Sequence, residues 1–376
     1  MKYTFLGNTG LRVSELALGT MRWGADEGTN HRILDAYTEA GGNFLDTANA
    51  YGASEAMLGK VLKGRRDGYA LATKYTLTTD PNDANAEGNG RKSLVRSLDA
   101  SLKRLQTDYV DLYWVHVWDG FTPVEETLEA LNDAVRQGKV LYVGLSDFPA
   151  WLVARADALA ELRGLTRPAA IQIKYNLAAR DAEREILPMA EALGLSILDW
   201  SPLGGGALTG KYLSKERGDE DAPYSEGSAE ARRGGAADYH AVRYRSERMS
   251  HIARTVVDAA EEIGCSPSQL AIAWLHHRSP LHIPIVGASS LQNVEDNLGA
   301  VNVEIPDEVA NRLASSSRIE LGFPLDFYRR SRVDNWYGGH LDNLDERVKP
   351  LGRRLMGFDE PRPAGGPAST TQPSSA

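Results

Sequence analysis

Side chains that together could move a proton recur through the first third of the chain: Asp46, Tyr51, Lys74 and His116. A phenol with a pKa near 10 is a weak acid at neutral pH, but a nearby ammonium stabilises its phenolate. We expect Lys74 to supply that charge and so to lower the pKa of Tyr51, and Asp46 to keep Lys74 protonated. His116 can donate a hydrogen bond to a carbonyl oxygen and help to place it.

This set predicts a site that gives a proton to the oxygen of an aldehyde or ketone as that oxygen becomes an alkoxide. It contains no group that could supply the hydride of such a reduction. Taken singly, each residue has a structural explanation, as a helix cap, a surface ion pair or a satisfied core group, so the prediction depends on their occurring together. Asp111 and Asp119 flank the same histidine. We expect the first to point outward from its strand and the second to cap a loop.

Short apolar segments, separated by amphipathic stretches of helical length, must position these residues. The predicted strands are residues 16–20, 43–46, 69–74, 109–116, 140–146, 170–175, 195–200 and 282–287. Nearly continuous apolar runs are typical of parallel strands that are covered on both faces. Eight strand–helix units in about 300 residues favour a (β/α)8 TIM barrel over a doubly wound sheet. Since all strands of such a barrel end at one mouth, Asp46, Lys74 and His116 are expected to meet there.

The residues between these segments agree with this fold. Helices are expected to end at Gly41, Gly138, Gly164 and Gly194, and one to begin at Ser266-Pro267. Residues 3–13 contain Asn8-Thr9-Gly10 between two short alternating runs, which predicts an N-terminal β-hairpin that plugs one end of the barrel.

Further segments fall outside the repeated pattern. Lys215 to Arg245 is polar, glycine-rich and too long for an ordinary connection, so it is either a lid or a surface excursion. After Arg318, aromatic residues that include Trp336 predict a C-terminal extension over the barrel mouth. We expect one domain over residues 1–340. Residues 341–376 form a polar tail rich in Pro, Gly and Ser, which we expect to be disordered from about residue 350.

Composition excludes several classes of protein. The chain has 376 residues, of which 42% are hydrophobic, and a net charge of −9, which argues against nucleic acid as a partner. Cys265 is the only cysteine, so a disulfide within the chain is excluded and no metal site is predicted. We find no signal peptide and no apolar run long enough to span a membrane, and we therefore expect a cytoplasmic enzyme. The sequence leaves the oligomeric state open.

Around the proton-transfer residues the chain resembles the aldo-keto reductase family. The resemblance lies in Phe44-Leu45-Asp46-Thr47-Ala48, Tyr51-Gly52, Ser54-Glu55, Leu58-Gly59, Ala72-Thr73-Lys74, Leu102-Lys103-Arg104-Leu105 and Asp108-Tyr109-Val110-Asp111-Leu112-Tyr113 through to His116. It covers residues 3 to about 340. It implies Tyr51 as the general acid, Lys74 and Asp46 as the residues that tune it, and His116 as the residue that orients the carbonyl. It also implies hydride transfer from a nicotinamide cofactor.

The resemblance further implies a set of cofactor-binding residues: Gly19, Thr20, Met21, Asp46, Ser146, Asp147, Gln172, Trp200, Ser201, Pro202, Leu203, Gly204, Gly206, Leu208, Lys211, Gly287, Ser289, Asn293, Asp296 and Asn297. Ser146 and Gln172 match the family's partners of the nicotinamide carboxamide. Asp147 stands where an asparagine is usual, and an ionised carboxylate can accept a hydrogen bond but cannot donate one. Trp200 matches the aromatic ring that stacks on the nicotinamide, although it could instead be a core residue at a strand end.

The glycine-rich loop from Ser201 to Tyr212 resembles the family's pyrophosphate loop, where backbone amides approach phosphate oxygens and Lys211 adds charge. The spacing from Gly205 to Lys211 is also that of a P-loop. Tyr212, however, occupies the place of the magnesium-binding Ser or Thr, so we do not expect a nucleoside triphosphatase.

Cofactor choice is less clear from the sequence. Gly287 and Asn293 stand where many family members place a lysine and an arginine against a 2′-phosphate. The loss of two cations removes charge-assisted hydrogen bonds worth about 1.5 to 3 kcal/mol each. The expected cofactor is NADPH, with NADH as an alternative.

The substrate is the least determined feature. His116-Val117-Trp118-Asp119 and the segment 121–126 are similar to the aryl-alcohol dehydrogenase-like branch, which is related to norsolorinic acid reductases. The expected substrate pocket contains Trp23, Tyr51, His116, Trp118 and Trp336, which favour an aromatic or medium-sized apolar carbonyl. Sugars and lactols remain alternative substrates. An alternative of another class is a cofactor-binding regulatory subunit with slow turnover, like the β subunits of potassium channels.

Overall fold

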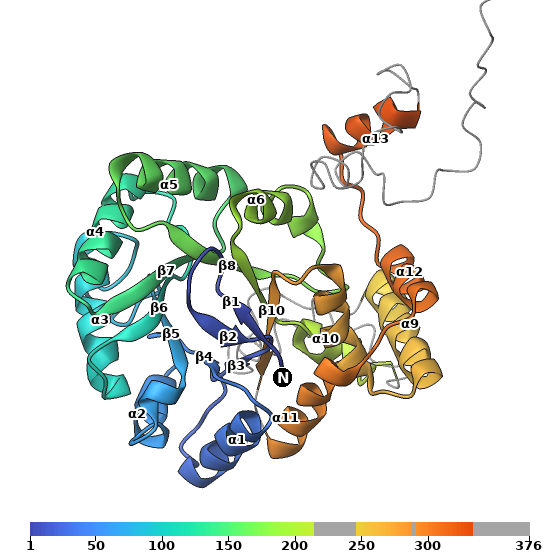
Figure 1. The fold of residues 1–376 in the computed structure, drawn as a ribbon, viewed down its shortest axis with the longest axis horizontal. Helices are drawn as coiled ribbons and strands as arrows, with labels where there is room; N and C mark the ends of the chain where they lie inside the picture. Colours follow the sequence, from blue (N-terminus) through green and yellow to red (C-terminus); the bar gives the residue numbers. More distant parts are fainter. Residues whose placement is uncertain (214–245, 288–289, 334–376) are drawn as a thin grey trace, which may run out of the picture.

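A computed structural model describes residues 1–213, 246–287 and 290–333, and in it parallel strands close into a barrel in the order β10-β3-β4-β5-β6-β7-β8-β9. The strands are β3 (Ala17–Gly19), β4 (Phe44–Asp46), β5 (Ala70–Tyr75), β6 (Val110–Val115), β7 (Val140–Ser146), β8 (Pro168–Lys174), β9 (Ser196–Trp200) and β10 (His282–Gly287). Figure 1 looks down this barrel. The predicted TIM barrel is confirmed, and no predicted strand end differs from the observed one by more than two residues.

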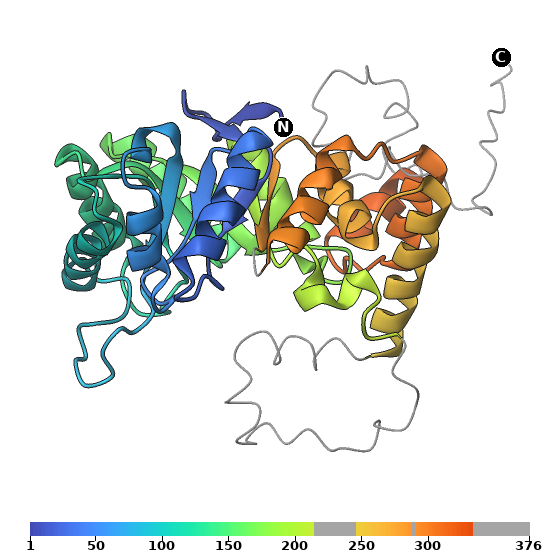
Figure 2. The same ribbon diagram turned by 90° about the horizontal axis from the view of Figure 1, so that it is seen from below.

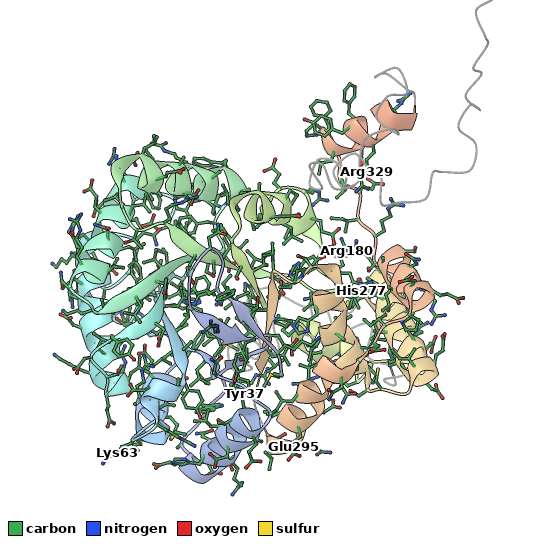
Figure 3. The ribbon with its side chains drawn as sticks, in the orientation of Figure 1. Tyr37, Lys63, Arg180, His277, Glu295 and Arg329 are labelled. Atoms are coloured by element: carbon green, nitrogen blue, oxygen red, sulfur yellow. The ribbon has the colours of Figure 1, made fainter. Side chains whose placement is uncertain are left out.

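Helices surround the barrel. They are α1 (Glu27–Glu39), α2 (Ser54–Val61), α3 (Arg91–Leu105), α4 (Val124–Arg136), α5 (Ala150–Arg163), α6 (Ile186–Leu193), α9 (Glu247–Ile263), α10 (Pro267–Arg278), α11 (Leu291–Leu298), α12 (Asp307–Ser316) and α13 (Leu325–Val333). Short 3-10 helices lie at η1 (Arg66–Gly68), η2 (Asp181–Glu183), η3 (Gly204–Thr209) and η4 (Gly299–Asn302). Tyr37 of α1 lies between its helix and the strands, whereas Lys63 and Glu295 lie at the outer edge (Figure 3).

The predicted helix ends are confirmed. Gly164 and Gly194 form the left-handed ends of α5 and α6, and Gly41 and Gly138 follow α1 and α4 with positive φ. Ser266 caps α10 through a capping box with Gln269, and Pro267 is the first residue of that helix. The helices on the outside of the barrel therefore begin and end where local residue types favour it.

The N-terminal hairpin closes one end of the barrel, as predicted. Its strands β1 (Tyr3–Phe5) and β2 (Arg12–Ser14) are antiparallel, and Leu6 and Val13 are buried with the residues of the barrel interior. The Gly7 amide donates to Ser196 Oγ over 2.7 Å, at the first residue of β9. Figure 2 shows the hairpin at one end of the barrel and η3 toward the other, which leaves the C-terminal ends of the strands as the mouth.

The C-terminal extension lies at the side of the barrel as far as the structure describes it. Arg184 Nη2 donates to the Glu320 carbonyl over 2.9 Å, and Leu321 and Leu325 line a cavity of about 180 Å³ beside Leu187 of α6. Figure 1 shows α13 outside the ring of helices, next to α6. The expected cover over the mouth is therefore not formed by the described part of this segment, in which Leu321 and Leu325 lie beside α6. Trp336 lies outside the described residues, as do residues 215–245 and 341–376.

Two further features concern the class of protein. None of the helices in the described ranges is both long enough and apolar enough to cross a membrane. In the same ranges, no group of three or more His, Cys, Asp or Glu side chains could hold a metal ion.

Candidate active site

The four residues predicted to transfer a proton meet at the mouth of the barrel. Asp46 ends β4, Lys74 lies near the end of β5, and His116 directly follows β6. Lys74 Nζ donates to an Asp46 carboxylate oxygen, and it lies 3.4 Å from the hydroxyl of Tyr51. The rings of Tyr51 and His116 meet edge to face, with centroids 5.7 Å apart. Parallel strands thus bring together side chains as far apart in the sequence as Asp46 and His116.

The turn that carries Tyr51 is held by hydrogen bonds of the residues around it. Beyond Asp46 the chain stays bonded to β5, since the Thr47 amide donates to the Ala72 carbonyl over 3.0 Å. Ser54 Oγ lies 2.8 Å from Thr47 Oγ1, and buried Glu55 accepts from Thr73 Oγ1 over 2.5 Å. Ser54 and Glu55 therefore support the turn through these hydrogen bonds, and we assign them no role in proton transfer.

Lys74 is fully buried, and its charge is stabilised by its neighbours. Burial alone disfavours an ammonium, but the charge of Asp46 and the hydrogen bonds to Asp46 and Tyr51 raise the pKa of Lys74 above its usual value. The Thr47 carbonyl accepts a further hydrogen bond from Nζ over 2.8 Å. Asp46 thus keeps Lys74 protonated, as the sequence predicted.

The pKa of Tyr51 is raised, not lowered as expected. Burial is the largest cause, and it outweighs the opposing effect of the Lys74 ammonium, while the Asp46 charge adds to the increase. The expectation was wrong because it counted the charge of Lys74 and left out desolvation. At neutral pH Tyr51 is a neutral phenol that carries the proton it would donate.

His116 is a neutral imidazole. Burial lowers its pKa to about 3, and the charge of Lys74 acts in the same direction. Its Nδ1 has no hydrogen-bond partner among the described residues. A neutral imidazole carries one N–H, so His116 can donate to a carbonyl oxygen without adding a charge to the site.

Gln172 joins the next strand ends to this network. The side-chain Nε2 of Gln172 donates to Asp46 Oδ1 over 3.0 Å. The backbone carbonyl of Gln172 accepts from the backbone amide of Asp147 over 3.0 Å. Ser146, the last residue of β7, is buried beside it. Reasoning from the sequence assigned Gln172 to a cofactor and missed its bond to Asp46, because no local pattern links residues that are 126 positions apart.

Asp147 and Trp200 form a second pair at the mouth. Trp200 Nε1 donates to Asp147 Oδ1 over 3.1 Å, and Lys174 Nζ lies 5.6 Å from the centroid of the Trp200 ring. Asp147 is in contact with solvent in a recess of the mouth, and the surrounding protein raises its pKa to about 6. The Trp200 bond and the charges of Lys74 and Lys174 only partly oppose that effect of burial. At mildly acidic pH part of the Asp147 carboxyl is therefore protonated, and in that form it can donate a hydrogen bond as well as accept one.

A cavity of about 740 Å³ opens at the mouth next to this pair. Trp118, Phe148 and Ile173 contribute apolar walls, while Asp147, Lys174 and Arg248 contribute charge. The prediction for Trp118 agrees with this lining, whereas Trp23 is buried in the core, and its Nε1 has no partner among the described residues. The sequence analysis missed Lys174, although it lies two residues after Gln172 on β8 and so on the same face of the strand.

The loop after β9 has the form expected of a phosphate-binding turn. Ser201 has a positive φ, Pro202 and Leu208 are buried, and Leu203 is half-buried. Gly204, Gly205 and Gly206 all have positive φ, and a Cβ at Gly206 would lie 2.5 Å from Lys211 Nζ. A Cβ at this point would require the flexible Lys211 side chain to move. A glycine turn with a cation at its side suits a pyrophosphate group.

The other residues assigned to a cofactor take different positions. Gly19 has no room for a Cβ beside Ile285, Thr20 Oγ1 bonds the Asp46 carbonyl over 3.1 Å, and Met21 is exposed. Thr20 therefore supports the strand end and is not free to bind a ligand through its hydroxyl.

Gly287 at the end of β10 and Asn293 in the first turn of α11 are exposed, and Asn297 Nδ2 lies 3.5 Å from the Gly287 carbonyl. Asp296 accepts from Ser266 Oγ over 3.0 Å and from Gln269 Nε2 over 3.2 Å. Its carboxylate is thus part of the cap of α10, which makes it a structural group. Ser289 lies outside the described residues.

Comparisons with known proteins agree with this geometry. The model of the Aldo/keto reductase family matches residues 15–318. The chain is 37% identical over 336 residues to norsolorinic acid reductase stcV of Emericella nidulans, covering 85% of this chain and 82% of that protein. It is 39% identical over 327 residues to the uncharacterized oxidoreductase YrpG of Bacillus subtilis, covering 83% and 95%.

A probable aryl-alcohol dehydrogenase of Saccharomyces cerevisiae is 34% identical over 306 residues, covering 78% of this chain and 89% of that protein. The matched region includes all eight barrel strands and the four residues at the mouth. The chain therefore belongs to the aldo/keto reductase family of oxidoreductases.

Proposed function

We propose that this protein reduces aldehydes or ketones with a hydride from NADPH and uses Tyr51 as the general acid. The observation that carries the proposal is the buried network at the mouth, in which Lys74 Nζ contacts both the Asp46 carboxylate and the hydroxyl of Tyr51. Proton donation needs a neutral phenol beside a fixed positive charge, and these contacts supply both.

The residues of this chain act on the carbonyl oxygen. When bound, the nicotinamide cofactor supplies the hydride. Tyr51 and His116 hold the oxygen by hydrogen bonds, and Tyr51 gives up its proton as negative charge develops there. The Lys74 ammonium, 3.4 Å from the phenol oxygen, stabilises the phenolate that remains. Asp46 keeps Lys74 charged and Gln172 fixes Asp46 in turn, so the cluster acts as a unit.

The same mouth offers groups for each part of the cofactor. Ser146, Asp147, Gln172 and Trp200 would hold the nicotinamide end. The loop from Ser201 to Lys211 would hold the pyrophosphate, because its glycine turn leaves space beside an ammonium. Gly287 and Asn293 would lie at the adenosine end. Neither carries the positive charge that favours a 2′-phosphate, so NADH remains an alternative to NADPH.

The proposed substrate is an aromatic or medium-sized apolar carbonyl compound. Trp118, Phe148 and Ile173 line the cavity that also contains Asp147, and its volume of about 740 Å³ is in the range of sites for small molecules. The names of the relatives, norsolorinic acid reductase and aryl-alcohol dehydrogenase, point to aromatic compounds. A sugar or lactol is the second candidate, since charged and polar groups also face the cavity.

The test is the loss of nicotinamide absorbance with a panel of aromatic aldehydes, ketones and sugars, each assayed with both cofactors. We expect turnover by the wild-type protein. In Tyr51→Phe, we expect it to fall about 10²-fold or more while cofactor affinity stays unchanged, because only the proton donor is lost. Cofactor binding without turnover of any carbonyl would instead favour a regulatory subunit. Wild-type turnover in Tyr51→Phe would show that Tyr51 is not the general acid.

A further inference from the structure

Asp147 is close enough to the reacting groups for its charge to matter to them. It accepts a hydrogen bond from Trp200 over 3.1 Å, and its backbone amide is bonded to Gln172, which is bonded in turn to Asp46. Its carboxylate adds to the raised pKa of Tyr51, after the larger effects of burial and Asp46. Because a hydride donor lies against the carbonyl that Tyr51 protonates, a bound nicotinamide ring would lie near the Asp147 carboxylate, whose charge acts on Tyr51.

The two forms of the cofactor differ in charge at that ring. The oxidised nicotinamide is a cation, whereas the reduced ring is neutral. A carboxylate at the mouth attracts the cation, and its charged form is disfavoured when a neutral ring covers it and removes water. We propose that Asp147 discriminates between the two redox states of the bound cofactor, with its carboxylate favouring the oxidised form. This inference rests on the proposed use of a nicotinamide cofactor.

The direction of the effect follows from proton linkage. In the protein without cofactor the pKa of Asp147 is raised to about 6, chiefly by burial. The cationic ring should lower this pKa and release protons on binding, while the neutral ring should raise it and take protons up. As the pH rises through this range, affinity for the oxidised cofactor should increase and affinity for the reduced cofactor should decrease.

Three titratable groups of the catalytic network near Asp147 have pKa values that are shifted away from that range. Lys74 of β5 has a raised pKa and stays an ammonium, and the pKa of Tyr51 is also raised. His116 has a pKa of about 3 and stays neutral. The charged side chains that line the cavity together with Asp147 are Lys174 of β8, Asp181 of η2 and Arg248 of α9.

The experiment measures the Kd values of NADP⁺ and NADPH by calorimetry at about pH 5.5 and about pH 8, on either side of the pKa of Asp147. In the wild-type protein we expect the ratio of the NADPH Kd to the NADP⁺ Kd to rise about tenfold, which corresponds to about 1.4 kcal/mol. The 2′-phosphate, with a pKa of about 6, is common to both cofactors and cancels in this ratio. In Asp147→Asn the ratio should change by less than about twofold, because no titrating group remains at that position.

The variant is well matched to the wild-type residue. Asp147 has φ +49°, a conformation that asparagine tolerates, and the Asn oxygen can still accept from Trp200. Asp181→Asn is the control: it removes an exposed carboxylate from the same cavity and should keep the wild-type rise. A flat ratio in the wild-type protein, or an equal rise in Asp147→Asn, would overturn the inference while leaving the proposed function intact. Absence of binding by either cofactor would overturn both.

Discussion

At the residue scale, the site depends on a buried ion pair. Lys74 is 0% exposed, and a buried ammonium without a partner would lose its proton. Asp46 prevents this, and both of its carboxylate oxygens are used, one by Lys74 and the other by Gln172. Removing one member would leave a buried charge uncompensated, which costs more than the pair contributes.

Because Asp46 and Lys74 act through one phenol, their substitutions should not be additive. We expect the double variant Asp46→Asn with Lys74→Met to lose little more activity than Lys74→Met alone. Steady-state kcat/KM of the wild-type protein, the two single variants and the double variant completes the cycle. Losses that multiply would show that the two residues act on separate steps.

Cofactor choice is also decided by single residues. Asn293 is exposed at the start of α11, and its backbone amide donates to Ser290 Oγ over 3.3 Å. Asn293→Arg should tighten NADPH binding by about tenfold or more and leave NADH almost unchanged, because the guanidinium meets a phosphate that only NADPH carries. Fluorescence titration with both cofactors measures this. An equal gain in affinity for both cofactors would mean that residue 293 does not contact the 2′-phosphate.

At the scale of elements, the loop after β9 combines several left-handed residues with one cation. Gly206 has φ +87°, and Lys211 fills the space where its side chain would be. The loop can adopt these left-handed conformations because its glycines have no side chain. Its position after β9 places it at the mouth. A substitution there should affect a ligand more than the fold.

We expect Gly206→Ala to weaken binding of both cofactors by about tenfold, because the methyl group displaces the ammonium and strains the turn by about 1 to 3 kcal/mol. Gly264→Ala is the control: it has a similar φ of +74° at the end of α9, with no atom within 4 Å of the added Cβ. It should lower the free energy of unfolding by about 1 kcal/mol and leave cofactor affinity unchanged. Calorimetric Kd values and denaturant unfolding separate the two effects.

At the scale of the whole molecule, the first residues of the chain complete the barrel. Leu6 and Val13 are fully buried against interior residues such as Phe44 and Leu198, which come from distant strands. The hairpin therefore adds to the core of the barrel while it closes one end. It also leaves one open end, and the catalytic residues lie there.

Gly7→Ala should test this closure. Residue 7 has φ +53°, and a Cβ there would overlap the carbonyl oxygen of Ala169 in β8, so the hairpin must shift. We expect the free energy of unfolding to fall by about 2 to 4 kcal/mol, measured by denaturant titration. Gly10→Ala, in the same hairpin with nothing within 4 Å of the added Cβ, should change it by less than about 0.5 kcal/mol. Similar losses in both variants would mean that the hairpin is not docked as described.

The sequence by itself determined the eight strands, the helix ends and the side chains that meet at the mouth. Those features follow from local patterns: apolar runs mark strands, glycines end helices, and parallel strands of a barrel end on one side. Asp46, Lys74 and His116 could be placed together for that reason alone. The position of Tyr51 followed from the short turn that begins at Asp46.

Only the tertiary structure decided the electrostatics and the remote contacts. The pKa of Tyr51 is raised because burial outweighs the charge of Lys74, and burial depends on every segment around the mouth. The bond from Gln172 to Asp46 and the raised pKa of Asp147 depend in the same way on strands far apart in the sequence. The segment that ends in α13 lies on the flank because Leu321 and Leu325 pack there. Desolvation and packing are sums over the whole fold, so no local pattern contains them.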